Sequence, residues 1–153
     1  MVAILVVAHQ PLASALAQSV THVYSACEQQ NRDISVLDVV PDDDVGATVE
    51  RARTLIDKID TGDGVLVLTD AFGATPGNVA SRLAQPGRIS VIAGVNLPML
   101  LRAVCYRNGA LADLVEKALA GGTQGVMEVG STSVQNQGYR PHGNDHARLH
   151  HQQ

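Results

Sequence analysis

The chain has few aromatic residues, and this scarcity excludes one class of function. Aromatic residues make up 3% of the 153 residues, and tryptophan is absent. Sites for single-stranded nucleic acid depend on aromatic faces for base stacking. The formal net charge is −4, and the sequence has no basic cluster of the kind that binds a phosphate backbone. We therefore expect no nucleic-acid partner.

Long apolar runs are also missing. No stretch approaches the roughly 20 apolar residues that a transmembrane helix needs. The apolar run at the N-terminus, Met1–Ala8, is short and lacks the basic region that opens a signal peptide. A hydrophobic fraction of 45% with 17% charged residues is ordinary for a globular protein. These features predict a cytoplasmic protein with one folded domain and a substantial core.

Several familiar site motifs do not occur. Cys27 and Cys105 have no CxxC spacing, so we interpret both as small apolar residues rather than as a disulfide or a metal site. The sequence contains no GxSxG elbow, which argues against a serine hydrolase. It contains neither a P-loop nor GxGxxG, so nucleotide binding by those motifs is unsupported. We expect no cofactor and no metal at the site.

Apolar runs and amphipathic segments alternate along the chain. Strands are predicted at 2–8, 34–39, 65–69 and 89–93, with a possible short last strand at Gln124–Val129. Helices are predicted from Leu12 to about Gln29, from the Asp42–Asp44 run to about Ile59, from near Pro76, from about Pro98, and at 110–120. This alternation predicts an α/β fold with a doubly wound, mostly parallel sheet. The strand order expected for a small domain of this kind is 2-1-3-4.

A histidine ends the first predicted strand, and an aspartate ends the third. In the order 2-1-3-4 these two strands are neighbours, so His9 and Asp70 should face each other at the carboxyl edge of the sheet. A carboxylate that accepts a hydrogen bond from one ring nitrogen fixes the tautomer and leaves the other nitrogen free for attack. If Asp70 holds Nδ1–H, then Nε2 is the nucleophile. The pair is the candidate catalytic site.

The segments around this pair suit an anion. We interpret Pro11 as a first-turn proline and Thr75-Pro76 as the N-cap and first-turn proline of another helix. Two helix N-termini beside one histidine form a phosphate cradle. Small residues let the loop backbone approach closely, and Thr75 offers a hydroxyl. The pattern predicts a phosphohistidine site, whose candidate phosphate-binding residues are Gln10, Gly73, Ala74 and Thr75.

Three segments carry a family resemblance: VVAHQPLA, LTDAFGATPGN and VIAGVNLPML. In this order they resemble the IIA component of the mannose family of the bacterial phosphoenolpyruvate:sugar phosphotransferase system, over about residues 2–130. The resemblance implies that His9 takes phosphate from the histidine phosphocarrier protein and passes it to a IIB partner, while Asp70 orients the ring. It also implies a homodimer in which the last strand, Gln124–Val129, is exchanged. Ala74 departs from the family, which usually has a second glycine there.

The resemblance divides the chain into a IIA domain at 1–130 and a polar tail at 131–153. The tail contains four histidines and is expected to be disordered. Because the sequence stops soon after the last predicted strand, we expect the IIB partner to be a separate protein, and contact with a membrane to be indirect, through a IIC/IID permease.

Two alternatives stay open at this point. One is a regulatory binding module whose phosphorylation state controls a partner without onward sugar transport. The other is the phosphocarrier subunit of dihydroxyacetone kinase, whose loop after the third strand differs from LTDAFGATPGN.

Overall fold

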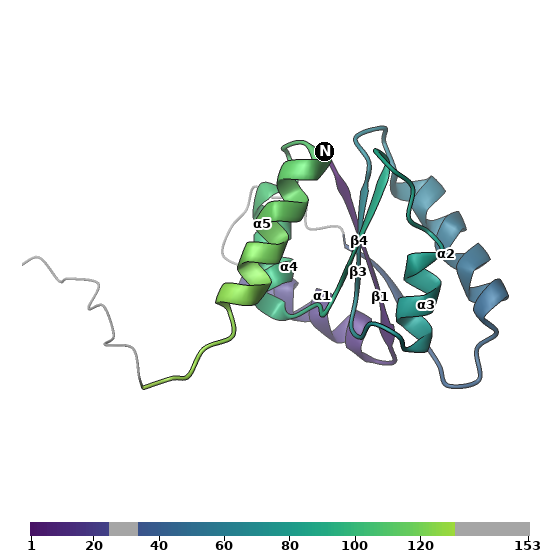
Figure 1. Ribbon diagram of the computed structural model, residues 1–153, viewed down its shortest axis with the longest axis horizontal. Coiled ribbons are helices and arrows are strands. Elements are labelled where there is room, and N and C mark those ends of the chain that lie inside the picture. The colour runs from purple at the N-terminus through teal and green to yellow at the C-terminus, as the bar shows by residue number, and fades with distance from the viewer. Residues whose placement is uncertain (25–33, 131–153) are drawn as a thin grey trace, which may run out of the picture.

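The computed structural model describes residues 1–24 and 34–130. Within these ranges, four strands alternate with helices (Figure 1). The strands are β1 (Ala3–His9), β2 (Ser35–Val39), β3 (Val65–Thr69) and β4 (Ile89–Ala93). The helices are α1 (Leu12–Val23), α2 (Val45–Ile59), α3 (Thr75–Ser81), α4 (Leu97–Tyr106) and α5 (Leu111–Gln124). Cys27 and the tail histidines lie outside the described residues.

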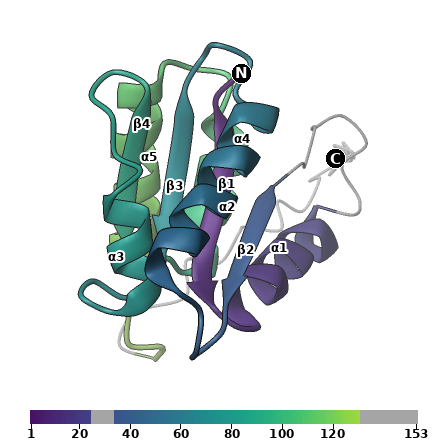
Figure 2. The ribbon, with the colours of Figure 1, turned by 90° about the vertical axis from the view of Figure 1, so that its right-hand side faces the viewer.

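The strands form one parallel sheet in the order β2-β1-β3-β4 (Figure 2). This confirms the predicted fold class and strand order. The register pairs Val7 with Thr69 on β3, and His9 with Val39 on β2. The carboxyl ends of β1 and β3 therefore lie side by side. The crossover helices leave these two strands toward opposite faces, which makes this point the topological switch of the sheet.

Strand β1 is apolar at every position before His9 because the sheet is covered on both faces. Its alternate residues Ile4 and Val6 pack with α1, α4 and α5, whereas Leu5 and Val7 pack with α2 and α3. Figure 1 shows the same three layers, with α2 and α3 on one side of the sheet and the other helices opposite. Central strands buried in this way give the carboxyl edge a rigid base.

The segment predicted as a last strand is not a strand in this chain. Gln124 is the final residue of α5, and no strand is assigned at 125–130. The helix continues because its glycines let it pack closely on α4: a Cβ at Gly121 would lie 2.7 Å from Cβ of Arg102. A strand also needs a neighbouring strand to pair with, and the sheet formed by the described residues contains only β2, β1, β3 and β4. Exchange of the segment between subunits stays a prediction.

Within the described ranges, no helix is both long enough and apolar enough to cross a membrane.

Candidate functional site

His9 and Asp70 are in direct contact although they lie 61 positions apart in the sequence. Nδ1 of His9 lies 2.7 Å from Oδ2 of Asp70. The backbone N–H of His9 donates to the same oxygen at 3.0 Å. The other carboxylate oxygen accepts the backbone N–H of Ala71 at 2.8 Å. The proximity predicted from the strand order is thus present, and the carboxylate is held at both oxygens.

The environment keeps Asp70 ionised. Burial raises the pKa of its carboxyl, but the hydrogen bonds from the backbone and ring of His9 and from Ala71 outweigh it, so the pKa lies below its usual value. An ionised carboxylate can only accept a hydrogen bond, so Nδ1 of His9 carries the proton. Nε2 then bears the lone pair. The His9 side chain is 51% exposed and that of Asp70 only 12%, which leaves the ring accessible and its partner sheltered.

The loop after β3 holds its shape through one glycine. Gly73 has φ +85°, a left-handed conformation that favours glycine. Ala74 has φ −86° and ψ 170°, which any residue can adopt, so an alanine fits where the family usually has a second glycine. Ala74 is the N-cap of α3 and Thr75 its first residue. The prediction of Thr75 as the N-cap was therefore wrong by one position.

The start of α1 differs more from the prediction. Pro11 is the N-cap rather than a first-turn residue. The backbone N–H of Ser14 donates to Oδ1 of Asp38 at 3.2 Å, and the Ser14 hydroxyl donates to the same carboxylate. The N–H of Gln10 donates to the carbonyl of Val39 at 3.0 Å. Part of the expected phosphate cradle is thus already satisfied within the protein, and Gln10 offers its side chain rather than its backbone.

Sequence reasoning missed Gly77. A Cβ at this position would lie 2.4 Å from the carbonyl oxygen of Ala71, closer than real contacts permit. The first turn of α3 can therefore pack against the loop that follows Asp70 only if residue 77 is glycine. The sequence feature that could have indicated it is a glycine directly after Pro76, within the first turn of a predicted helix.

The loop after β3 also carries an exposed aromatic side chain, Phe72. It is the only phenylalanine in the chain, and it is 89% exposed in the loop two residues after Asp70. In the sequence, Phe72 is an aromatic residue with small residues on both sides.

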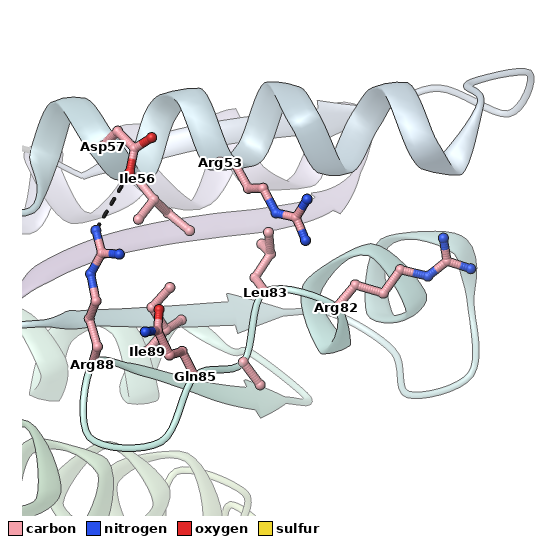
Figure 3. Close-up of a pocket in the computed structure, with 9 residues that line it drawn as sticks. Arg53, Ile56, Asp57, Arg82, Leu83, Gln85, Arg88 and Ile89 are labelled. Carbon is pink, nitrogen blue, oxygen red and sulfur yellow. Dashed lines mark ion pairs between the residues drawn. The ribbon is translucent and has the colours of Figure 1, made fainter.

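A separate hollow of about 310 Å³ lies at the opposite, amino edge of the sheet. It is lined by the second half of α2 and by residues 82–89 (Figure 3). Arg88 crosses it to pair with Asp57 at 3.5 Å and with Asp60 at 2.8 Å. Arg53 pairs with Glu50. Two of the three arginines that line this hollow thus pair with carboxylates, and none of its lining residues belongs to the loops around His9 and Asp70. Among the described residues, no cluster of His, Cys, Asp and Glu could hold a metal ion.

Comparison with known proteins assigns the family. Residues 3–119 match the family model described as "PTS system fructose IIA component". The chain belongs to this family. Its members are components of sugar phosphotransferase systems, and they are phosphotransferases in the general sense. The resemblance to mannose-family IIA components is thereby confirmed.

Individual relatives agree with this assignment. The chain is 34% identical over 111 residues to the mannose-specific EIIAB component of Escherichia coli K12, covering 71% of this chain. It spans about a third, 34%, of that relative's length. It is 47% identical over 58 residues to the fructose-specific EIIA component of Bacillus subtilis, covering 37% of this chain and 40% of the relative. A solved EIIA component from Streptococcus agalactiae superposes with a TM-score of 0.68 at 28% identity, covering 84% of this chain and 97% of that one.

Proposed function

We propose that the protein is a phosphocarrier that accepts a phosphoryl group on His9 from the histidine phosphocarrier protein and passes it to a IIB component. The observation that carries this proposal is the 2.7 Å contact between Nδ1 of His9 and the Asp70 carboxylate. It supports the proposal because it leaves Nε2 as an exposed nucleophile with a fixed tautomer.

The transfer is a simple displacement. The lone pair on Nε2 of His9 attacks the phosphorus of the donor's phosphohistidine, and the donor's P–N bond breaks with its electron pair returning to the donor ring. The His9 ring becomes a cationic imidazolium that bears the anionic phosphoryl group on Nε2 and still donates Nδ1–H to Asp70. The negative carboxylate stabilises that cation, as it does in other His–Asp pairs. No reactant besides the two proteins is consumed. Transfer to the IIB component is the same kind of displacement, with phosphorylated His9 as the donor.

Gln10, Gly73, Ala74 and Thr75 are the proposed phosphate contacts. The loop at 73–75 supports this role because it begins three residues after Asp70 and carries little side-chain bulk. The backbone N–H groups of this loop and the hydroxyl of Thr75 are suited to phosphate oxygens. The exposed side chain of Gln10, next to the nucleophile, is the fourth candidate.

Phosphate transfer in a reconstituted system tests the proposal. The protein is incubated with phosphoenolpyruvate, enzyme I and the histidine phosphocarrier protein, and its intact mass is measured. We expect one added phosphate that is stable to base and labile to acid, as a phosphohistidine is, and absent from His9→Ala. No phosphate on the wild-type protein, or an unchanged gain in His9→Ala, would refute the proposal.

The destination of the phosphate decides between transport and regulation. Candidate IIB proteins are added to the labelled protein, and the label is followed onward. Transfer to a IIB protein supports a role in sugar uptake. Label that stays on His9 with every IIB protein would favour the regulatory module, and transfer to a dihydroxyacetone kinase subunit would favour that alternative. The homodimer implied by the family is tested separately, by the mass of the protein in solution.

A further inference from the structure

We propose that the hollow between α2 and residues 82–89 is a binding site for a small organic phosphate, a phosphorylated compound that also carries hydroxyl groups. The inference goes beyond the proposed function, because the hollow lies at the opposite edge of the sheet from His9 and Asp70. The shape of the hollow, the three arginines that line it and its apolar floor carry the inference.

The hollow exists because α3 is short. Helix α3 has 7 residues and ends at Ser81, whereas α2, on the same face of the sheet, has 15 residues. At 1.5 Å per residue, α3 spans only about half the length of α2. Beyond Ser81 the chain returns to β4 as a loop (Figure 2). The space left beside α2 has a volume of about 310 Å³, at the lower end of the range for small-molecule sites.

The loop that forms one wall of the hollow is held by its own backbone. The N–H of Ile89 donates to the carbonyl of Gln85 at 2.8 Å, and the N–H of Gln85 donates to the carbonyl of Ile89 at 3.1 Å. Gly87, inside this turn, has φ +77°, a left-handed conformation that glycine adopts without strain. The wall is therefore formed before any ligand arrives, and binding does not require the ordering of a loop.

The hollow gathers positive charge on an acidic protein. The chain has a formal net charge of −4, yet three arginines and one aspartate line this hollow. Arg53 comes from α2, Arg82 is the C-cap of α3, and Arg88 lies just before β4. The guanidinium group donates two parallel hydrogen bonds to one phosphate, which makes arginine the preferred side chain for this group.

One of the three arginines has a structural role. Nε of Arg88 lies 2.8 Å from the carboxylate of Asp60, and a terminal nitrogen of Arg88 lies 3.5 Å from that of Asp57. Figure 3 shows Arg88 and Asp57 at one end of the hollow, whereas the guanidinium groups of Arg53 and Arg82 lie toward the other end. Phosphate is therefore expected at the end that holds Arg53 and Arg82, away from the Asp57 carboxylate.

Arg53 and Arg82 keep donors that a ligand can use. Arg53 pairs through one terminal nitrogen with Glu50, whose side chain is 69% exposed. Exposed pairs of this kind are weak and are readily exchanged for a stronger partner. Among residues 1–24 and 34–130, no carboxylate lies within ion-pair distance of Arg82. Two guanidinium groups from different elements can thus converge on one phosphate.

The floor of the hollow favours an organic phosphate over a bare inorganic ion. Ile56, Leu83 and Ile89 are buried members of the core on this face of the sheet, and they also line the hollow. An ion as small as phosphate would leave this apolar floor uncovered, whereas a short carbon chain or ring would pack on it. The side-chain amide of Gln85 lies on the loop wall (Figure 3) and can donate to or accept from a hydroxyl group.

The test measures binding of glycerol 3-phosphate and glucose 6-phosphate to the full chain, by calorimetry and by the amide signals in two-dimensional NMR. We expect at least one of them to bind saturably with Kd below about 1 mM and to shift signals of residues 53–57 and 82–89. Glycerol and glucose, which lack the phosphate, should not bind measurably. His9→Ala should give the same Kd as wild type, since its site is at the other edge.

Matched variants test the two arginines. Arg53→Gln and Arg82→Gln should each raise Kd by about tenfold, as for loss of a charged hydrogen bond. Arg82→Lys keeps the charge without the planar fork and should recover part of the affinity. Arg51→Gln is the control, because Arg51 is on α2 but pairs with Asp43 outside the hollow. Thermal unfolding checks that each variant is folded.

Three outcomes would overturn the inference. The first is the absence of saturable binding by both phosphates, or equal Kd values for Arg53→Gln, Arg82→Gln and wild type. The second is a set of shifts confined to the loops around His9 and lost in His9→Ala, because the phosphate would then occupy the proposed phosphoryl site. The third is equally tight binding of succinate, since the hollow would then not select phosphate.

These outcomes are separate from the test of the proposed function. Arg82→Gln should still be phosphorylated on His9 at the wild-type rate. Wild-type protein that binds glucose 6-phosphate but gains no phosphate on His9 would refute the proposed function alone.

Discussion

At each edge of the sheet an aspartate carboxylate contacts a nitrogen-containing side chain, but the two pairs differ in their chemistry. At the carboxyl edge, His9 and Asp70 meet at 2.7 Å, and at the amino edge, Arg88 and Asp60 meet at 2.8 Å. Arginine keeps its charge at every accessible pH and has no lone pair to offer. Histidine gains and loses a proton near neutral pH and retains a second ring nitrogen. Asp60 is therefore paired with a permanent cation at one edge, whereas Asp70 at the other edge is paired with a ring whose second nitrogen stays available.

The backbone shows the same division. At the amino edge, the chain closes on itself through hydrogen bonds from Val2 to the carbonyl of Arg107 at 2.8 Å and from Val65 to that of Arg88 at 2.8 Å. At the carboxyl edge, the loop after β3 turns through Gly73 and leaves Phe72 in solvent. The backbone is thus closed by hydrogen bonds at the amino edge, whereas the loop at the carboxyl edge leaves a side chain exposed.

The largest expected effect is on phosphate uptake in His9→Ala. Removal of the nucleophile should abolish phosphorylation by the phosphocarrier protein. The free energy of unfolding should change by less than about 1 kcal/mol, because the lost ring is half exposed and its contact is screened by solvent. His22→Ala, at an exposed site on α1, is the matched control and should be phosphorylated normally. Intact mass and thermal unfolding measure the two effects.

Asp70→Asn should slow phosphorylation by about a hundredfold. The amide can stabilise the wrong tautomer of His9 and carries no charge to balance the phosphorylated ring. Folding should be preserved, since the amide oxygen can still accept one of the backbone N–H groups. Single-turnover rates with the phosphocarrier protein measure the effect, and Asp60→Asn is the control at the other edge. Equal rates for Asp70→Asn and wild type would show that Asp70 has only a structural role.

Gly77→Ala should lower the free energy of unfolding by about 2 kcal/mol, the usual cost of overpacking. The added methyl group would displace the carbonyl of Ala71 and with it the loop that holds Asp70, so phosphorylation should also slow. Denaturant unfolding measures the first effect. In Gly109→Ala the new Cβ would find its nearest neighbour at an ordinary 3.5 Å, and this variant should be close to wild type. A stable Gly77→Ala protein would contradict the close packing of α3 on the loop.

The smallest expected effect is a loss of stability in Asp60→Asn that depends on pH. Hydrogen bonds from Arg88 and from the backbone of Gly62 hold the pKa of Asp60 below its usual value. The folded state thus binds a proton less readily than the unfolded state, and the pair stabilises the fold at pH values above about 4. As the pH falls through the lowered pKa, this contribution disappears.

For Asp60→Asn we therefore expect about 1 kcal/mol of destabilisation at pH 7, small because Arg88 is 45% exposed and solvent screens the pair. The difference from wild type should shrink as the pH falls below about 4 and Asp60 becomes protonated in the folded state, and urea unfolding over this acid range can compare the two proteins. A difference that persists in acid would show that the packing of Asp60, rather than its charge, is responsible. Phosphate uptake should be unchanged at neutral pH.

Much of the fold could be predicted because burial on both faces of a sheet leaves a clear pattern. An apolar residue at each of six successive positions, as at Ala3–Ala8 before His9, is typical of a central strand buried on both faces. Element ends were less predictable. The N-cap of α3 is Ala74 rather than Thr75. The backbone conformation of Ala74 after Gly73 sets where the helix begins, and no side chain in the sequence indicates that conformation. The end of α5 depended on its packing against α4, a contact between distant segments.

What the sequence by itself determined is the four strands of the sheet, the order of the elements and the candidates His9 and Asp70, since hydrophobic periodicity and strand ends are local properties of the chain. Tertiary structure alone decided the hydrogen-bond geometry that assigns the proton to Nδ1, the use of Asp38 at the start of α1, and the exposure of Phe72. Each of these depends on side chains that meet across the sheet or on how much of a ring the packed chain leaves exposed. Such distances exist only once residues far apart in the chain are packed together.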